Sequence, residues 1–363
     1  MILDRLVVQN FRNIESADLK VNPQANVIYG ANGSGKTSVL EAISLLAHGK
    51  SFRSHLSTPL VKHGQSSTVM FSTLIDPVTG TAIPVGIEKH LRKGTNIRIN
   101  KSNAKSTSEL ARLLPFLVVD GAAFTVIDGA SKYRRKILDW LVFHVEPRFH
   151  RAWLGYQTAL KQRNALLRRG ILSGHEFDIW GQQCVEYGDL VTHLRMQWFS
   201  RLQAELEGLW ADLGLSINLS FHKGWKEPLS LNDAFIEYHE GDCQRQTTRN
   251  GPHRADLLLN CDEGKVAEVF SRGQKKTAIL ALYLAVVSQF IKANNSKPVI
   301  ALDDLPAELD KNHIQSVLAV LLERAHQVFI TTINKEQVLE LLPADIQLSV
   351  FHVEHGRITQ ESI

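Results

Sequence analysis

The sequence predicts an α/β fold, with a mixed β-sheet and flanking helices, an antiparallel β meander, and a second, mostly helical lobe that forms a short arm. Three observations predict it: a strand, a glycine-rich loop and a helix near the N-terminus, helix-period apolar stripes in the middle, and compact apolar strands near the end. We expect three segments. Residues 1–120 and 295–363 should build one lobe, and residues 121–294 the helical lobe and its arm.

The composition is that of a globular protein with a large core. The chain has 363 residues, and 44% of them are hydrophobic. Its 41 Lys and Arg residues against 37 Asp and Glu residues leave a formal net charge of +4, so a nucleic-acid site would have to be a local patch. Cys184, Cys243 and Cys261 lie far apart without a C-x-x-C pair, which predicts neither a disulfide framework nor a zinc site and fits a reducing cytoplasm.

The N-terminal residues predict strands that lead into a glycine loop. Residues 3–8 and 26–29 are strand-like, with the turn-forming Asn22 and Pro23 between them, and we expect them to form a strand pair. No signal-peptide layout precedes them, so export is not expected. Short β-branched runs between residues 69 and 99 predict the antiparallel meander. After the loop, helical spacing relates Val39, Leu40, Ile43, Leu46 and Ala47.

The middle of the chain predicts two helices packed as a hairpin. A turn is expected at residues 169–174, and the stripes run for too few heptads to make a long coiled-coil rod. The apolar run at residues 277–291 is shorter than the roughly 20 residues that cross a bilayer, so it predicts a buried helix and no membrane partner. One stripe contains Phe149, Trp153, Tyr156 and Leu160, and the other contains Trp180, Cys184, Tyr187, Val191, Leu194 and Trp198.

Residues 30–37, Gly-Ala-Asn-Gly-Ser-Gly-Lys-Thr, match the phosphate-loop pattern G-x-x-x-x-G-K-[ST] in the required strand, loop and helix context. Glycines let successive backbone N–H groups converge on phosphates, and the following helix presents its positive N-terminus. We expect Lys36 to reach the outer phosphates and Thr37 to hold Mg²⁺. The nucleotide-binding candidates are Gly30, Ala31, Asn32, Gly33, Ser34, Gly35, Lys36, Thr37 and Ser38.

Residues 299–304 form an apolar strand that ends in two carboxylates, the form of a Walker B segment. Asp303 is expected to bind Mg²⁺, directly or through water. Asp304 stands where a carboxylate can orient or deprotonate the attacking water, but it reaches less far than glutamate, so we expect slow hydrolysis. By itself such a pair is more often a turn or a helix cap. Lys36, Asp303 and Asp304 are the catalytic candidates.

Residues 270–274, Phe-Ser-Arg-Gly-Gln, resemble the signature motif of ABC ATPases, with Arg272 in place of a second glycine. In that superfamily the signature faces the γ-phosphate bound by a second subunit, which implies an ATP-dependent homodimer. A simple helix cap is the alternative. The residues expected to act in trans are Ser271, Arg272, Gly273 and Gln274.

Two later segments resemble further ABC elements. Residues 307–310 resemble the D-loop, which points to Glu308 and Asp310, and Thr331-Thr332 stands at the switch position, where Thr332 replaces the histidine usual in transporters. No clear Q-loop glutamine is found between residues 113 and 124.

Four segments carry a resemblance to the RecF family of SMC/ABC-type P-loop ATPases: residues 9–13, 48–54, 132–140 and 251–257, in the family's order along nearly the whole chain. This chain departs from the family pattern at Val119-Asp120-Gly121, where the family usually has Pro-Glu. The resemblance implies an ABC/SMC-type head and a weak, DNA-stimulated ATPase that uses ATP and Mg²⁺ in the cytoplasm. It further implies an ATP-clamped dimer on double-stranded DNA beside single-stranded gaps, helping RecA to load with RecR and RecO.

The basic residues have two interpretations each. Arg12, in the first matched segment, contacts either the nucleotide or an acidic residue within the head. For His253 and Arg254, a polar loop that holds the arm against the head and a DNA or interface role are both open. Clusters of Lys and Arg are candidates for phosphate contacts, although a solvated helix face is the commoner explanation. The DNA-binding candidates are Arg53, Lys132, Arg134, Arg135 and Lys136, with a second cluster at Lys161, Arg163, Arg168 and Arg169.

Two other classes of protein share these motifs. A transporter ATPase is disfavoured by the long interval between Thr37 and Ser271, by the missing switch histidine and by the arm. An architectural, DNA-clamping ATPase like SMC and Rad50 proteins is the second alternative, but it needs a far longer heptad-patterned insertion.

Overall fold

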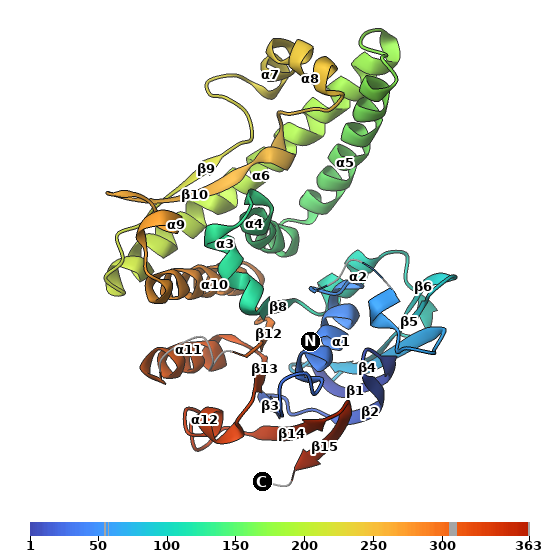
Figure 1. Ribbon diagram of the computed structural model, residues 1–363, viewed down its shortest axis with the longest axis vertical. Helices are drawn as coiled ribbons and strands as arrows, with labels where there is room; N and C mark the ends of the chain where they lie inside the picture. Colours follow the sequence, from blue (N-terminus) through green and yellow to red (C-terminus); the bar gives the residue numbers. More distant parts are fainter. Residues whose placement is uncertain (54–55, 57, 305–310, 362–363) are drawn as a thin grey trace. The chain divides into compact units, whose positions relative to one another are not determined.

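The structure is a computed structural model that describes residues 1–53, 56, 58–304 and 311–361, and it divides into two compact units (Figure 1). The head unit contains Met1–Ala123 and Asn295–Ile363, and the arm unit contains Phe124–Asn294. The expected boundary at residue 120 falls just before the first division. Each unit is described by itself.

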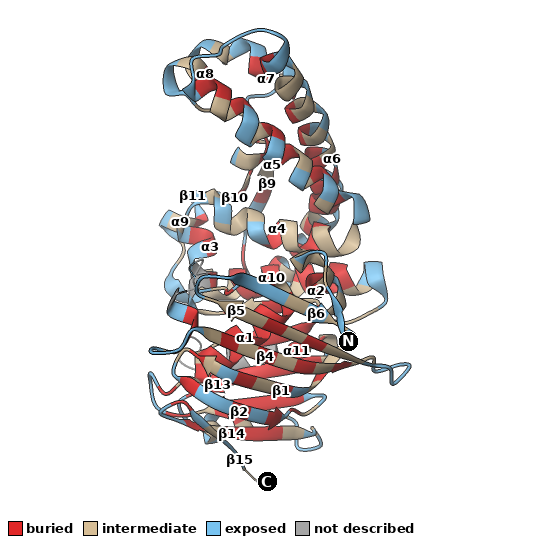
Figure 2. Ribbon diagram, turned by 90° about the vertical axis from the view of Figure 1, so that its right-hand side faces the viewer, coloured by how far each residue is buried: buried red, intermediate tan, exposed pale blue. Residues whose placement is uncertain are grey.

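The head unit contains an antiparallel sheet of six strands in the order β2-β1-β4-β5-β6-β7. Burial alternates along β4, as expected for a sheet with one face in the core (Figure 2). The predicted meander between residues 69 and 99 is therefore confirmed. The strands are β1 (Ile2–Phe11), β2 (Ile14–Lys20), β4 (Ser67–Ile75), β5 (Ala82–His90), β6 (Gly94–Ile99) and β7 (Ser102–Asn103).

A second, mixed sheet of the head unit has the order β15-β14-β3-β13-β12-β8. All neighbours pair in parallel except β14 and β15. β12 and β13 are buried along their whole length, which suits parallel strands covered on both faces. The strands are β3 (Ala25–Tyr29), β8 (Phe116–Val119), β12 (Val299–Leu302), β13 (Gln327–Thr332), β14 (Leu348–Glu354) and β15 (Arg357–Glu361).

The expected pair between residues 3–8 and 26–29 is wrong. β1 pairs with β2 and β4, whereas β3 lies in the other sheet between β13 and β14. A tight turn at Arg12 and Asn13 folds the chain back at once, so β2, which sequence reasoning missed, occupies the place beside β1.

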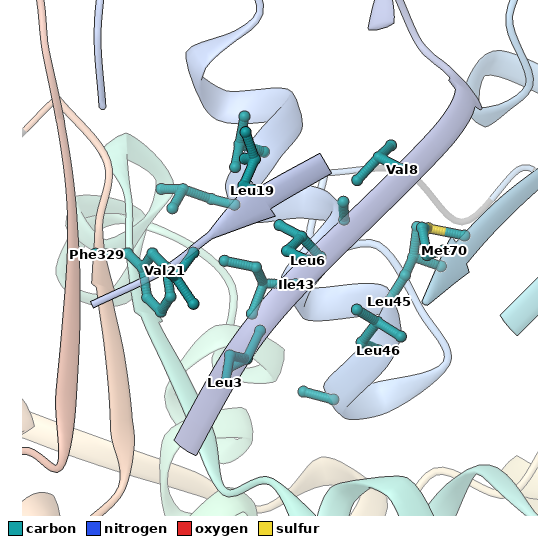
Figure 3. Packing of buried hydrophobic residues seen from close by; sticks show 14 of the residues in the cluster. Leu3, Leu6, Val8, Leu19, Val21, Ile43, Leu45, Leu46, Met70 and Phe329 are labelled. Carbon is teal, nitrogen blue, oxygen red and sulfur yellow. The ribbon is translucent and has the colours of Figure 1, made fainter. Parts of the chain in front are cut away.

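Helix α1 (Lys36–His48) packs its apolar residues into the core of the head unit. Figure 3 shows Ile43, Leu45 and Leu46 of α1 beside Leu6 of β1 and Met70 of β4. Eleven residues of this helix are buried, so burial and not helix propensity stabilises it. The other head helices are α2 (Thr107–Leu113), α11 (Lys311–Arg324) and α12 (Lys335–Leu339).

The arm unit contains the predicted helical hairpin, made by α5 (Pro147–Arg168) and α6 (His175–Asp212). Sequence reasoning missed a three-stranded antiparallel sheet in this unit, with the order β11-β10-β9. Its other elements are α3 (Thr125–Asp128), α4 (Ser131–Val145), β9 (Asn218–His222), α7 (Leu231–Glu237), α8 (His239–Arg245), β10 (Asp256–Cys261), β11 (Gly264–Lys265), α9 (Val266–Val269) and α10 (Arg272–Asn294).

Helix α10 is the one helix among the described residues whose length and composition would allow it to cross a membrane. Most of its apolar window is buried inside the protein, where it packs against α4 and α6. The indole Nε1 of Trp210 on α6 donates to the Ala278 carbonyl at 3.4 Å. The prediction of a buried helix at residues 277–291 is confirmed.

Candidate nucleotide-binding site

The phosphate loop lies between β3, which ends at Tyr29, and α1, which begins at Lys36. Gly35, the residue before the helix, has φ +122°, a conformation that other residues rarely adopt. A Cβ at Gly30 would lie 2.2 Å from the carbonyl oxygen of Val353. The two outer glycines are therefore required by backbone conformation and by close packing.

Lys36 folds back over the loop. Its Nζ donates to the carbonyl oxygens of Gly30 at 2.9 Å and Ala31 at 3.1 Å, and the residue is buried. The Oγ atom of Ser34 is also buried and has no hydrogen-bond partner among the described residues. An ammonium group, an unpaired hydroxyl and a helix N-terminus without a side-chain cap meet the needs of a phosphate group.

The carboxylates at the end of β12 meet the start of α1. Thr37 Oγ1 donates to Asp303 Oδ1 at 3.0 Å, and Thr331 Oγ1 donates to the same oxygen at 2.7 Å. The backbone N–H of Asp304 donates to Thr331 Oγ1 at 2.9 Å. Carboxylate and hydroxyl oxygens are the ligands that Mg²⁺ prefers, so the donor set formed by Thr37 and Asp303 fits that ion.

Burial raises the pKa of the Asp303 carboxyl, and the neighbouring charge of Asp304 raises it further. Hydrogen bonds from Thr331 and Thr37 and the positive charge of Arg53 oppose this rise in pKa. The ionised form of Asp303 is therefore disfavoured in the nucleotide-free site, and a bound divalent cation would stabilise it. Arg53, which the sequence suggested as a DNA contact, therefore acts electrostatically on Asp303. Its DNA contact stays a prediction.

Thr331 is the switch-region residue that contacts the acidic pair. Thr332, to which sequence reasoning gave the switch role, instead exchanges hydrogen bonds with the backbone of Asn334 at 3.0 and 3.3 Å. Two adjacent threonines cannot be distinguished by pattern, because both are buried at the end of β13. The D-loop candidates Glu308 and Asp310 lie outside the described residues.

Arg12 forms an ion pair within the head unit. Its Nη2 and Nε lie 2.6 and 2.8 Å from the two carboxylate oxygens of Glu41, a fully buried residue of α1 that also accepts from Ser51 Oγ. Of the two interpretations of Arg12, the salt bridge is the one observed, and the nucleotide contact stays a prediction.

A cavity that sequence reasoning did not anticipate lies beside the loop. It has a volume of about 610 Å³, and Arg12, Asn13 and Ser38 line it together with residues 59 and 61–65. Ser38 belongs to the first turn of α1, so the cavity adjoins the phosphate loop. Its size suits a nucleoside.

The signature segment forms a capping box at the start of α10. Gln274 N–H donates to Ser271 Oγ at 3.3 Å, and Ser271 N–H donates to Gln274 Oε1 at 3.0 Å. The helix cap is therefore present. Ser271, Arg272, Gly273 and Gln274 are all exposed.

Two of the predicted DNA contacts, Arg134 and Arg135, have partners inside the protein, and a DNA contact of either stays a prediction. The Arg134 guanidinium pairs with both carboxylate oxygens of Asp256, at 2.7 and 2.9 Å, and its side chain is 12% exposed. Arg135 donates to the Ala255 carbonyl, and burial lowers its pKa. Both arginines hold α4 against the start of β10. Lys132 and Lys136 are exposed on the same helix.

Two other polar candidates are internal to the arm unit. Arg163, from the second basic cluster, is buried and pairs with Asp242 at 2.8 Å. His253 contacts the hydroxyl of Tyr156 at 2.6 Å and the carbonyl of Thr248 at 3.1 Å, and burial lowers its pKa to about 4. These bonds hold the loop of His253 within the arm unit, and a contact of this loop with the head, with DNA or with a partner stays a prediction.

Comparison with known proteins identifies the family. Residues 2–359 match the family described as RecF/RecN/SMC N terminal domain. The chain is 37% identical to the DNA replication and repair protein RecF of Pseudomonas syringae pv. tomato, covering 99% of this chain and 98% of the relative. It is 36% identical to the protein of the same name from Cellvibrio japonicus, with 99% of both chains covered.

Solved structures agree with this result. The fold matches a structure of the recombination mediator protein RecF-ATPrS in the RecFOR pathway with a TM-score of 0.86 and 25% identity, covering 99% of this chain and 98% of the other. An Smc head bound to a domain of ScpA matches with a TM-score of 0.60 and 14% identity over 100% and 98%, which shows the shared head fold alone. This chain belongs to the RecF family of DNA replication and repair proteins, within the ABC/SMC-type ATPases.

Proposed function

We propose that this protein is a DNA-stimulated ATPase of recombinational repair, which binds double-stranded DNA beside single-stranded gaps as an ATP-clamped dimer in the cytoplasm. The observation that carries the proposal is the meeting of Thr37 and Asp303, 3.0 Å apart, at the end of a glycine loop whose lysine is buried over the loop. Segments 1–120 and 295–363 supply this site, and segment 121–294 supplies the signature. The relatives named RecF support the repair role.

Lys36 and the loop residues 30–38 bind the triphosphate in this proposal. The Lys36 ammonium leaves the carbonyls of Gly30 and Ala31 for the phosphates, and Ser34 Oγ gains the partner it lacks. Thr37 and Asp303 hold Mg²⁺, which neutralises phosphate charge when bound. Arg12 and Ser38 line the cavity for the nucleoside.

Asp304 orients the attacking water. Its backbone N–H is fixed by Thr331, and its φ of +55° is unusual for an aspartate. A strained residue beside a buried carboxylate is typical of a site where position matters more than stability. The short side chain of Asp304 supports a low hydrolysis rate.

Ser271 and the following helix start read the ATP of a second copy. The four signature residues are exposed and already ordered by their capping box, so a partner's phosphate meets a preformed helix N-terminus. The D-loop candidates Glu308 and Asp310 are proposed to contribute to the same dimer contact, and we propose that the switch role given to Thr332 belongs to Thr331, which bonds to Asp303.

DNA is proposed to contact Lys132 and Lys136 of the arm unit and Arg53 of the head unit. These lysines carry exposed charge, which suits phosphate contacts without sequence preference. From the family we further propose action with RecR and RecO on RecA. The internal bonds of Arg134 and Arg135 favour the two lysines over these arginines as DNA contacts.

Light scattering with and without ATP and a gapped duplex tests the proposal. Wild-type protein should pair only with ATP, Lys36→Ala should lose nucleotide binding, and Ser271→Arg should bind ATP without pairing. Ser200→Arg, an exposed serine on α6, is the matched control and should pair normally. ATP-dependent pairing by Ser271→Arg equal to that of the control would refute the trans role of the signature.

A further inference from the structure

We propose that Asn13 and the turn of the C-terminal hairpin β14–β15 brace the phosphate loop through the carbonyl of Ser34, and so set its affinity for ATP. Asn13 and Gly356 are positioning residues in this view, and neither contacts the reacting atoms. The inference rests on the proposed binding of ATP at residues 30–38.

Two donors from distant parts of the chain converge on one carbonyl oxygen. Asn13 Nδ2 donates to Ser34 O at 2.7 Å, and the backbone N–H of Gly356 donates to the same oxygen at 2.8 Å. Asn13 also accepts a hydrogen bond from Ser38 Oγ at 3.3 Å, on the first turn of α1. One asparagine therefore connects the loop to the helix that follows it.

The peptide plane explains why this contact matters for binding. In a trans peptide the C=O of Ser34 and the N–H of Gly35 point in opposite directions. Fixing the oxygen toward Asn13 and Gly356 therefore directs the Gly35 N–H away from the brace. A phosphate loop binds through amides that are oriented before the ligand arrives, so freedom of this peptide would weaken binding.

The hairpin turn fits too closely against the turn at Asn13 for any other residue at position 356. Gly356 has φ +80°, and a Cβ there would lie 2.1 Å from the carbonyl oxygen of Asn13. Just before the turn, the carbonyl oxygen of Val353 lies against Gly30, at the other end of the loop. The hairpin thus contacts both the first glycine of the loop and the carbonyl of Ser34.

The end of the hairpin is also held beside the loop. The Glu361 carboxylate, in β15, accepts hydrogen bonds from the Tyr29 hydroxyl and from Lys335 Nζ. Tyr29 is the last residue of β3, immediately before Gly30, and its ring stacks on His352 with a centroid distance of 4.7 Å. These contacts keep β15 and its turn in register with the loop.

Titration with a fluorescent ATP analogue tests the brace. Gly356→Ala and Asn13→Ala should each weaken binding by about tenfold, the change expected when one of the two hydrogen bonds to Ser34 O, of about 1.4 kcal/mol, is lost. Gly356→Asn tolerates a positive φ but keeps the clash, so it should bind as weakly as Gly356→Ala. Melting temperatures measured beside the titrations report stability separately.

Matched controls come from the same unit. Gly94 also has a positive φ, +86°, but a Cβ there meets nothing within 4 Å, so Gly94→Ala should match Gly356→Ala in backbone strain and keep wild-type affinity. Asn22→Ala removes a turn asparagine whose side chain accepts from Gln24 N–H, and it should also bind normally. In the described part of the chain, neither Gly94 nor Asn22 is hydrogen-bonded to residues 30–38.

Folded Asn13→Ala protein that binds ATP like wild type would overturn the brace, and so would wild-type affinity in both Gly356 variants. If Gly356→Ala does not fold, Asn13→Ala decides the question. Failure of the proposed function looks different, because wild-type protein and Lys36→Ala would then show equal, negligible ATP binding.

Discussion

Replacing Thr331 with valine should destabilise the head unit through the buried acidic pair. The Thr331 hydroxyl donates to Asp303 Oδ1 at 2.7 Å and accepts from Asp304 N–H at 2.9 Å. Valine has nearly the same shape, so the substitution removes two hydrogen bonds without opening a cavity. One bond is to a charged group, worth about 1.5–3 kcal/mol, and the other leaves a backbone donor unpaired at about 1 kcal/mol.

The expected loss is therefore about 3 kcal/mol in the free energy of opening, or roughly 100-fold faster exchange of protected amides in β3 and β13. Hydrogen-exchange mass spectrometry of peptides from these strands measures it directly. Tryptophan fluorescence does not, because all six tryptophans lie between residues 140 and 225, in the arm unit.

Thr332→Val is the matched control. Among the described residues its hydroxyl bonds only to the backbone of Asn334, which is exposed to water, so its removal should cost about 1 kcal/mol or less. Equal exchange rates in the two variants would refute the assignment of the switch contact to Thr331. Slower ATP hydrolysis in Thr331→Val than in Thr332→Val is expected for the same reason.

Three further predictions concern buried ionisable groups. Because a raised carboxyl pKa makes ionisation costly above that pKa, Asp303→Asn should raise the melting temperature of nucleotide-free protein at pH 7, measured by calorimetry. The same variant should reduce ATP hydrolysis at least about 100-fold, measured by phosphate release. Burial lowers the pKa of His253 to about 4, so the neutral imidazole contributes its full stability above pH 6.5 and this contribution decreases as the pH falls from 6.5 towards 4. In His253→Gln the urea midpoint of unfolding, followed by tryptophan fluorescence, should therefore depend less on pH in this window than in wild type. Arg134→Met leaves the partly buried carboxylate of Asp256 unpaired and should destabilise the arm unit by about 1.5–3 kcal/mol, whereas Lys132→Met should change its stability by less than about 0.5 kcal/mol in the same urea assay.

Each of these has a clear contrary result. A lower melting temperature for Asp303→Asn would contradict the cost of its ionisation. A persistent pH dependence in His253→Gln would place the titrating group elsewhere. Equal urea midpoints for the Arg134 and Lys132 variants would contradict the internal role of Arg134.

Local pattern in the sequence was sufficient for the phosphate loop, the Asp303 strand, the meander and the arm hairpin. In each case the information lies within a few neighbouring residues: glycines at fixed spacing before Lys36, apolar residues before Asp303, and helical periods on both sides of residues 169–174. The family resemblance could be found for the same reason, because its segments are short and continuous.

Tertiary structure decided which polar residues have partners inside the protein. Arg134, Arg135 and Lys132 lie within one short basic run, but only the folded chain shows that the two arginines meet Asp256 and Ala255, more than a hundred positions away, while the lysine stays exposed. Thr331 and Thr332 differ in the same way, since only one of them faces Asp303.

The sequence by itself determined the chemistry available at the site: the ammonium group, the hydroxyl and the carboxylates. The fold alone decided their neighbours, because contacts such as Thr37 to Asp303 and Gly356 to Ser34 join residues about 270 and 320 positions apart. The physical reason is that side-chain type is local, whereas hydrogen-bond partners and burial depend on which distant strands become adjacent in a sheet.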